Sequence, residues 1–294
     1  MKQLIMSGKI ILPERRTDSH KGTYGHLYII AGSPCYVGAA LLAERAAMAA
    51  LRTGAGLVTL VVPHSMQEVY GKRVTESMLM FLPDIDGEIL FDKPCLEKII
   101  DKADCIVIGM GLGGNKELKQ ITDYLINNSD IPIMLDADGI NCYEGFKPKF
   151  RSRVILTPHP KEFERISGVY PAEPATAAKE YADYSGAVVH LKGTESVTAA
   201  PDSDTVYINK SYGSELAKGG SGDVLSGIIG ALVMDSTRGQ VGVQRSTRPL
   251  SPLCYLIATA AEVHRRAAHL AAETMPARSV IASDVVEFIP KVMD

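Results

Sequence analysis

The strongest constraint on the fold of this chain is the alternation of short apolar runs with longer helical patterns. Six runs have the length and β-branched content of strands: 27–31, 57–62, 105–108, 132–135, 154–156 and 188–191. Helical patterns occupy 38–53, 116–127, 161–166 and 176–184. Three of the runs are almost entirely apolar, which is typical of parallel strands covered on both faces. The alternation predicts an α/β fold whose central, mostly parallel β-sheet is flanked by helices on both faces.

The last third of the chain has a different pattern. Two further strands are expected at 196–200 and 205–208, because a turn-rich segment joins them. Long alanine- and leucine-rich helices follow at 224–234 and 252–273, separated by a polar, arginine-bearing loop at 235–251. No internal repeat or linker divides the chain, so we predict a single domain over residues 1–294.

Composition excludes several classes of protein. The net charge of −3 offers no basic surface for a nucleic acid or an anionic membrane. The five cysteines are scattered without a C-x-x-C pair, which argues against a disulfide framework and a zinc site. The N-terminus lacks the apolar segment of a signal peptide, and no apolar stretch reaches the ~20 residues of a membrane span. We therefore expect a cytoplasmic protein.

Unusual residues follow five of the predicted strands. These segments are 31–40, 109–114, 136–141, 157–162 and 192–196. In a parallel α/β sheet, ligands bind at the carboxyl ends of the strands. The five segments therefore predict one shared cleft.

The sharpest feature is the glycine-rich segment 218–227, which opens the long apolar helix. Consecutive glycines before a helix allow backbone N–H groups to converge on an anion, and the helix dipole adds to that attraction. Asp223 is negatively charged and therefore a poor ligand for an anion. It is better interpreted as a base that faces the atom that receives or loses the phosphoryl group. The structural alternative is a first-turn aspartate that only interacts with the dipole. The glycines, together with Lys192 upstream, favour the base.

Taken together, these segments resemble the ADP/ATP-dependent NAD(P)H-hydrate dehydratase family of the ribokinase-like superfamily. The resemblance extends from about residue 20 to the tail at 284–290. Its carrying segments are 20–22, 30–33 with 38–39, 54–58, 109–113, 135–138, 191–193, Thr-Pro-His-Pro at 157–160 and Gly-Gly-Ser-Gly-Asp at 219–223. The last two motifs together are far more specific than either alone.

The resemblance implies a repair reaction on a damaged cofactor. Members of the family dehydrate (6S)-NADHX or NADPHX, hydrated at C6 of the nicotinamide ring, back to NADH or NADPH, using ADP or ATP with Mg²⁺. Phosphorylation of the ring hydroxyl turns a poor leaving group into a good one, and phosphate is then eliminated.

By the same resemblance, each motif receives a role. Asp223 would deprotonate the hydroxyl, and the amides of Gly220, Ser221 and Gly222 would form an anion hole. The nucleotide would contact Lys192, Gly193, Thr194, Glu195, Ser196 and Gly222. The dinucleotide substrate would contact Ala39, Ala40, Gly113, His159 and Asp223, and Glu162 would orient Mg²⁺ through water.

Plainer interpretations stay open for several of these residues. His159 lies between two prolines, which also fits a rigid structural turn. Lys192 fits an ordinary surface lysine at a strand end, and Glu162 fits a solvated first-turn glutamate. Asp136 and Asp138 fit turn caps as well as ligands of substrate or metal.

Two departures from the family pattern concern substrate detail. Lys161 stands where the family pattern has glycine, and the loop 235–251 is atypical. Many relatives carry an N-terminal epimerase domain, for which the segment before His20 is too short. We therefore expect a separate NAD(P)HX epimerase as functional partner, and the resemblance suggests a homotetramer.

Two other functions compete with this one. Residues 109–114 match G-x-G-x-x-G, and Asp136 follows roughly twenty residues on, as in NAD(P)-dependent dehydrogenases. That motif lies mid-chain, however, and leaves residues 219–223 without a role. A small-molecule kinase of the same fold, acting on a vitamin precursor or a sugar, would share the phosphoryl-transfer machinery.

Overall fold

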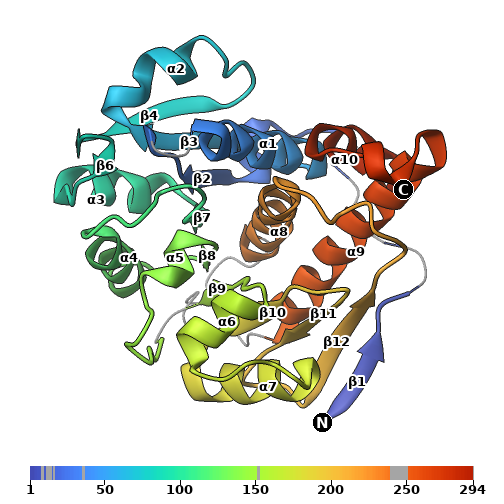
Figure 1. The fold of residues 1–294 in the computed structure, drawn as a ribbon. Helices are drawn as coiled ribbons and strands as arrows, with labels where there is room; N and C mark the ends of the chain where they lie inside the picture. The colour runs from blue at the N-terminus through green and yellow to red at the C-terminus, as the bar shows by residue number, and fades with distance from the viewer. Residues whose placement is uncertain are drawn as a thin grey trace.

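A mostly parallel sheet forms the centre of the molecule. The computed structural model describes residues 1–7, 10, 15, 17–34, 37–150, 153–238 and 251–293. Within these residues, ten strands form one sheet in the order β1-β12-β11-β10-β9-β8-β7-β2-β3-β4. Only β11 runs against the others, because it pairs antiparallel with both β10 and β12. The predicted α/β architecture is confirmed (Figure 1).

The strands are short, as expected for a buried parallel sheet. Their bounds are β1 (Lys2–Ile5), β2 (His26–Ile30), β3 (Leu57–Pro63), β4 (Met78–Leu82), β7 (Cys105–Ile108), β8 (Ile133–Leu135), β9 (Val154–Leu156), β10 (Val188–Leu191), β11 (Glu195–Ala199) and β12 (Thr205–Lys210), with a separate hairpin of β5 (Asp84–Ile85) and β6 (Glu88–Ile89).

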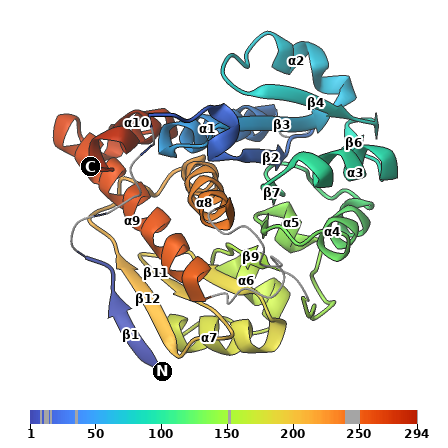
Figure 2. The ribbon, with the colours of Figure 1, turned by 180° about the vertical axis from the view of Figure 1, so that it is seen from behind.

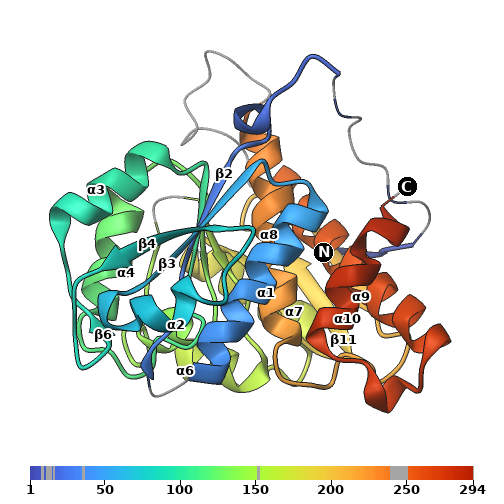
Figure 3. The same ribbon diagram turned by 90° about the horizontal axis from the view of Figure 1, so that it is seen from above.

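Helices cover both faces of the sheet. Their bounds are α1 (Val37–Thr53), α2 (Gln67–Gly71), α3 (Lys93–Lys102), α4 (Leu118–Asn127), α5 (Asp138–Asn141), α6 (Pro160–Ser167), α7 (Pro174–Ser185), α8 (Ser221–Arg238), α9 (Ser251–Thr274) and α10 (Ala282–Phe288). Figure 3 shows α1, α8, α9 and α10 on one side of the strands, with α3 and α4 on the other. The view from behind shows α9 crossing β11 and β12 (Figure 2).

Strand β2 shows why the sheet has two cores. Leu27 and Ile29 point into the core beneath α1, α8 and α9, whereas Tyr28 and Ile30 point into the core beneath α3, α4 and α6. Successive side chains of a strand face opposite sides of a sheet, so a strand that is apolar throughout must be covered twice. The burial on both faces that the apolar runs predict is therefore confirmed for β2.

The predicted elements agree closely with the observed ones in the centre of the sheet. The predictions at 105–108, 154–156 and 188–191 match β7, β9 and β10 residue for residue. The predicted loop 235–251 is wrong at both ends, because α8 continues to Arg238 and Ser251 already belongs to α9. Residues 239–250 lie outside the described residues. No helix in the described part of the chain is both long enough and apolar enough to cross a membrane.

Candidate active site

The candidate site lies where the order of the strands reverses. From β2, the chain goes outward to β3 and β4 on one side, and it later fills β7 to β10 on the other. Ligands of open α/β sheets bind at the carboxyl ends of the strands at such a point. The loops after β2 and β7 meet there, because the Gly32 N–H donates to the Met110 carbonyl at 2.9 Å. Of the residues predicted to bind substrate, Ala39 and Ala40 lie in the first turn of α1, and Gly113 follows β7.

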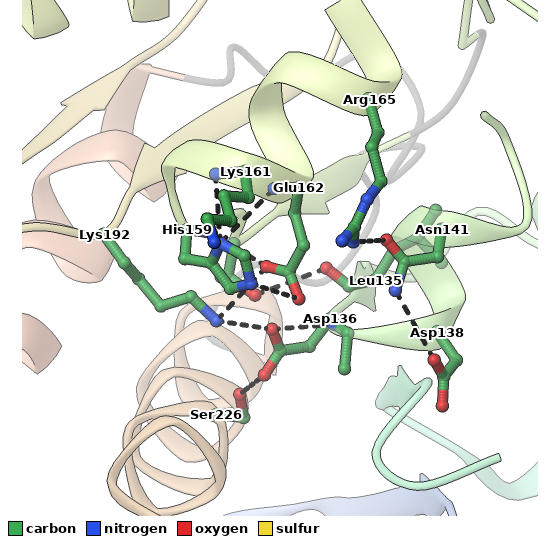
Figure 4. A network of polar contacts seen from close by, with 12 residues as sticks. Leu135, Asp136, Asp138, Asn141, His159, Lys161, Glu162, Arg165, Lys192 and Ser226 are labelled. Atoms are coloured by element: carbon green, nitrogen blue, oxygen red, sulfur yellow. Dashed lines mark hydrogen bonds and ion pairs between the residues drawn. The ribbon is translucent and has the colours of Figure 1, made fainter. Parts of the chain in front are cut away.

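Asp136 is the hub of the polar network shown in Figure 4. It follows β8 and is 3% exposed. Its Oδ1 accepts from Lys192 Nζ at 2.8 Å, and its Oδ2 accepts from Ser226 Oγ at 2.7 Å. Burial alone would raise the pKa of the Asp136 carboxyl, but the Lys192 ammonium and the hydrogen bonds lower that pKa overall. Asp136 does more than cap a turn: its Oδ1 accepts the Ala137 N–H at 3.0 Å, but both carboxylate oxygens also accept from the side chains of Lys192 and Ser226.

Lys192 connects this carboxylate to the start of α8. Its side chain is 22% exposed, and its Nζ lies 2.8 Å from Asp136 Oδ1 and 3.9 Å from Glu162 Oε2. A Cβ on Gly222 would lie 3.7 Å from the same Nζ. Burial lowers the pKa of Lys192, but the two carboxylates raise it overall, so the side chain is cationic. Lys192 is therefore not the ordinary surface lysine that the sequence left open.

His159 and Glu162 form a reciprocal cap at the start of α6. His159 Nδ1 accepts the N–H groups of Lys161 at 3.1 Å and Glu162 at 3.3 Å, and Glu162 Oε2 accepts the His159 N–H at 2.8 Å. This confirms a structural role for the turn. The Glu162 side chain is only 7% exposed, so the solvated interpretation is wrong.

The ring of His159 nevertheless stays accessible at the site. Its side chain is 45% exposed, with Nε2 3.4 Å from Glu162 Oε1. Partial burial, followed by the charge of Lys192, lowers the pKa of His159, which favours the neutral ring that its Nδ1 acceptor role requires. Lys161 is exposed beside it, where its bulk borders the site.

The glycine turn places the first turn of α8 against α1. Gly220 has a φ of 87°, and a Cβ there would lie 2.7 Å from the Leu42 side chain, so only glycine fits. Helix α8 begins at Ser221, three residues earlier than predicted, so Ser221, Gly222 and Asp223 form its first turn. First-turn N–H groups have no partner within their helix. The Ser221 N–H makes only a long bond, of 3.4 Å, to the Lys218 carbonyl.

The carboxyl group of Asp223 has a strongly raised pKa. Burial, followed by the negative charge of Asp136, raises its pKa to about 7, and the cation of Lys192 only partly opposes this. A helix dipole alone would lower the pKa of a first-turn aspartate. The pKa of Asp223 is therefore shifted in the direction opposite to the one expected for an aspartate that only interacts with the helix dipole. A carboxyl group with a pKa near neutral pH is suited to accept and release a proton.

No metal cage exists in the described part of the chain. None of its histidine, cysteine, aspartate and glutamate side chains gather in threes around a point that could hold a metal ion. Mg²⁺ commonly binds through one or two carboxylates together with waters and substrate phosphates. Glu162 fits that kind of site only together with a bound nucleotide.

The segment 109–114 does not form a dinucleotide-binding turn. A Cβ on Gly109 would lie 1.8 Å from the Asp136 carbonyl oxygen, so this glycine permits two loops to touch. The Gly113 N–H donates to Asp138 Oδ2 at 2.7 Å, and α4 begins only at Leu118. Both oxygens of Asp136 are already occupied by protein donors. The dehydrogenase interpretation, which needs Asp136 for a ribose, is therefore wrong.

Of the predicted nucleotide residues, Gly193 and Thr194 lie in the turn from β10 into β11, and Glu195 and Ser196 are the first residues of β11. Sequence reasoning missed the residue that contacts this turn from behind. Arg265 of α9 is 6% exposed and donates to the carbonyls of Gly193 and Thr194. An arginine within an alanine-rich helix usually faces solvent, so residue type and spacing carried no signal for it.

Comparison with known proteins agrees with this geometry. A family model described as NAD(P)H-hydrate dehydratase matches residues 27–291. The chain is 34% identical over 292 residues to the bifunctional NAD(P)H-hydrate repair enzyme of Moorella thermoacetica, covering 96% of this chain and 52% of that protein. It is 31% identical over 297 residues to the ADP-dependent (S)-NAD(P)H-hydrate dehydratase of Bacillus subtilis, covering 96% of this chain and 93% of the relative. The chain thus spans about half the length of the bifunctional relatives.

Solved structures give the same result. A Bacillus subtilis ADP/ATP-dependent NAD(P)H-hydrate dehydratase, co-crystallised with ATP and Mg²⁺, is similar with a TM-score of 0.77 and 30% identity, covering 96% of this chain and 93% of that one. A ribokinase-like superfamily protein of Enterococcus faecalis has a TM-score of 0.79 at 22% identity, with 99% and 95% of the two chains covered, and it shows the fold alone. The predicted ribokinase-like fold is confirmed.

Proposed function

This chain belongs to the NAD(P)H-hydrate dehydratase family, and on that premise we propose that it dehydrates (6S)-NADHX and NADPHX to NADH and NADPH at the expense of ADP or ATP. The observation that carries the proposal is Asp223, a carboxyl group with a pKa of about 7 in the first turn of α8. It stands beside a glycine turn on one side and the cation of Lys192 on the other. A base, an anion site and a cation together are the requirements of phosphoryl transfer to a hydroxyl group.

The reaction begins at the hydroxyl group on C6 of the nicotinamide ring. Asp223 accepts the hydroxyl proton while the hydroxyl oxygen attacks the terminal phosphoryl group of the nucleotide. The rest of the nucleotide is the leaving group, which is AMP when the donor is ADP and ADP when the donor is ATP. The amides of Gly220, Ser221 and Gly222 face the charge on the transferred phosphoryl group. The C6–O bond then breaks, phosphate departs with the bonding electrons, and loss of a proton from C5 restores the ring double bond.

We assign the nucleotide and the dinucleotide substrate to two largely separate sets of residues. We assign Lys192, Gly193, Thr194, Glu195, Ser196 and Gly222 to the nucleotide, and Ala39, Ala40, Gly113, His159 and Asp223 to the dinucleotide. Lys192 supports its assignment, because its ammonium lies between the Asp136 hub and the first turn of α8. His159 supports its own, because its side chain is 45% exposed and lies beside Glu162, within the electrostatic reach of Lys192 and Asp136.

Glu162 is our candidate for Mg²⁺. Burial raises the pKa of its carboxyl group, so a cation bound beside it would stabilise the charged carboxylate. Bound there, Mg²⁺ would neutralise charge on the nucleotide phosphates. Lys192 and the N–H groups of α8 are the chain's own contribution to that neutralisation.

The partners follow from the chemistry of the substrate. The reaction uses only one epimer at C6. A separate NAD(P)HX epimerase would therefore convert the other epimer into the one that this reaction uses. We also propose that residues 1–294 act as one domain within a homotetramer, which size-exclusion chromatography with light scattering would test.

The proposed function is tested by absorbance at 340 nm. Purified NADH hydrate is mixed with the protein, Mg²⁺ and either ADP or ATP, and recovery of the reduced-nicotinamide band is followed. We expect recovery that depends on the nucleotide and identifies the donor. If the protein binds a nucleotide but recovers no NADH with either one, the proposal fails in favour of a small-molecule kinase of the same fold.

A further inference from the structure

A buried arginine holds the turn that we assign to the nucleotide. Arg265 lies on α9, about 70 residues from the turn along the chain, as expected for contacts between separate layers of a fold. Its Nη1 donates to the Thr194 carbonyl at 3.2 Å. Its Nη2 donates to the Gly193 carbonyl at 3.0 Å and to Ser196 Oγ at 3.2 Å. One planar guanidinium therefore contacts two carbonyls of the turn and one side chain at the start of β11, which a single ammonium could not do.

These bonds help to set the direction of two backbone N–H groups, together with the Ser211 N–H, which also donates to the Thr194 carbonyl at 2.9 Å. In a trans peptide, the C=O and N–H bonds point in opposite directions. The Gly193 carbonyl shares its peptide with the Thr194 N–H, and the Thr194 carbonyl shares its peptide with the Glu195 N–H. Because both carbonyls point at Arg265, both N–H groups are turned away from α9. Successive N–H groups held in a turn are a common way to bind an oxyanion.

Strand pairing does not require this arginine. The hairpin of β10 and β11 is already registered by the pairs Val189–Ala199, His190–Thr198 and Leu191–Val197. Arg265 contacts residues outside that ladder, of which Ser196 pairs with Asn209 of β12 and Thr194 accepts the Ser211 N–H at 2.9 Å through its carbonyl. The Gly193 carbonyl is the contact that belongs to Arg265 and not to strand pairing. Burial lowers the pKa of its guanidinium, so the position is costly for a cation. A buried cation behind a turn strengthens the positive potential that an anion meets there.

We infer that Arg265 is a positioning residue for the nucleotide, which holds the turn at Gly193 and Thr194 and the start of β11 in the conformation that receives the phosphate and ribose groups. This inference rests on the proposed function, because it assumes that the turn binds ADP or ATP. Arg265 acts from behind the turn and stays out of contact with the dinucleotide substrate.

The test compares Arg265→Met with Arg266→Met. Arg266 is the next residue of α9, and its Nε donates to Glu262 at 2.8 Å. Both substitutions remove one guanidinium from the same helix, but only the first removes the contacts with the turn. We expect Arg265→Met to raise KM for the nucleotide by about 10- to 100-fold, as the loss of charge-assisted hydrogen bonds predicts. KM for NADH hydrate should stay within about twofold, and Arg266→Met should leave both values close to wild type.

A conservative variant separates positioning from general stability. Arg265→Lys keeps the positive charge but loses the planar set of N–H donors of the guanidinium, so its KM for the nucleotide should lie between those of wild type and Arg265→Met. The inference is overturned if Arg265→Met lowers the melting temperature without changing the nucleotide KM relative to Arg266→Met. If Arg265→Met does not fold, a wild-type nucleotide KM in Arg265→Lys overturns it.

Failure of the proposed function would look different. In that case the wild-type protein itself recovers no NADH from the hydrate. Calorimetric titration with ADP then takes the place of KM for the same three variants. A Kd for ADP that is equal in Arg265→Met and wild type would overturn the inference, whereas a Kd raised only in the Arg265 variants would support it.

Discussion

Two clusters of polar side chains in this molecule, each built around buried carboxyl groups, differ in their balance of charge. The site cluster comprises Asp136, Glu162, Lys192 and Asp223; the α9 cluster comprises Asn209, Tyr212, Glu262 and Arg266. In the α9 cluster, the one carboxylate of Glu262 accepts from Asn209 at 3.1 Å, Tyr212 at 2.8 Å and Arg266 at 2.8 Å. In the site cluster, three carboxyl groups share the one ammonium of Lys192.

The difference separates a structural cluster from a reactive one. Glu262 is satisfied by donors that the fold supplies, so nothing further is needed to stabilise its charge. In the site cluster, Lys192 holds the pKa of Asp136 down, whereas burial and like charge raise the pKa values of Glu162 and Asp223. Such unbalanced charge is costly to folding, and it is what a site needs if a proton and a phosphoryl group are to move there.

The largest expected effect comes from removing the base. Asp223→Asn should lower the rate of NADH recovery by about 10²- to 10⁴-fold, because a positioned base contributes that much. Nucleotide binding should be retained, since the glycine turn and Lys192 are intact. The assay at 340 nm and a titration with ADP measure the two properties separately.

The matched control is Asp92→Asn. Asp92 caps α3, where its side chain accepts the Cys95 N–H at 2.8 Å, and asparagine is an equally good cap. This variant should keep the wild-type rate. A near-normal rate in Asp223→Asn would remove that residue from the mechanism.

The comparison of the two clusters predicts a second contrast, between Asp136→Asn and Glu262→Gln. Removing the negative charge of Asp136 should lower the pKa of Asp223, because a like charge no longer opposes its ionisation. The acidic limb of the rate profile should then move to lower pH by about one unit, while the rate at pH 8 falls about 10-fold as Lys192 loses its partner.

Glu262→Gln should act on stability instead. Loss of its ion pair should lower the free energy of unfolding by about 1–3 kcal/mol, and the acidic limb should stay where it is. Denaturant unfolding and a pH series of initial rates provide the two readouts. If both variants move the limb equally, the distinction between the clusters is wrong.

A smaller effect concerns the stability of the site cluster itself. The pKa of Asp223 is about 7 in the folded chain, against about 3.9 for an unfolded aspartate. Ionisation therefore penalises the folded state, and the penalty grows as the pH rises from about 4 to about 7. The free energy of unfolding of Asp223→Asn should be about 1–3 kcal/mol higher than that of wild type at pH 8, and this difference should vanish near pH 4. Thermal unfolding at the two pH values would detect it, and a destabilised variant at pH 8 would contradict it.

Much of the fold could be predicted because it rests on local patterns. Strands such as β7 and β9 are apolar on both faces, so length and composition alone identify them. The edge strands β1 and β4 were missed, because β1 is exposed along its whole length and carries no such pattern. The early start of α8 was missed because Gly222 and Asp223 are poor helix formers, held in place here by packing against α1.

The site was only partly within reach of the sequence. Motifs pointed to Lys192, His159, Glu162 and Asp223, but they left the burial of Glu162 and the hub role of Asp136 undecided. Those properties arise from contacts between distant segments, such as Ser226 with Asp136 and Arg265 with Gly193. Residue type and spacing do not encode such contacts.

The most direct test of this account is a titration of the aspartate carboxyl carbons by ¹³C NMR, on wild type and on Asp223→Asn. We predict that one wild-type aspartate titrates near pH 7 and that its signal is missing from the variant. If every wild-type aspartate instead titrates below about pH 5, as ordinary carboxyl groups do, Asp223 is not held near neutrality, and the site lacks the base on which the proposed dehydration depends.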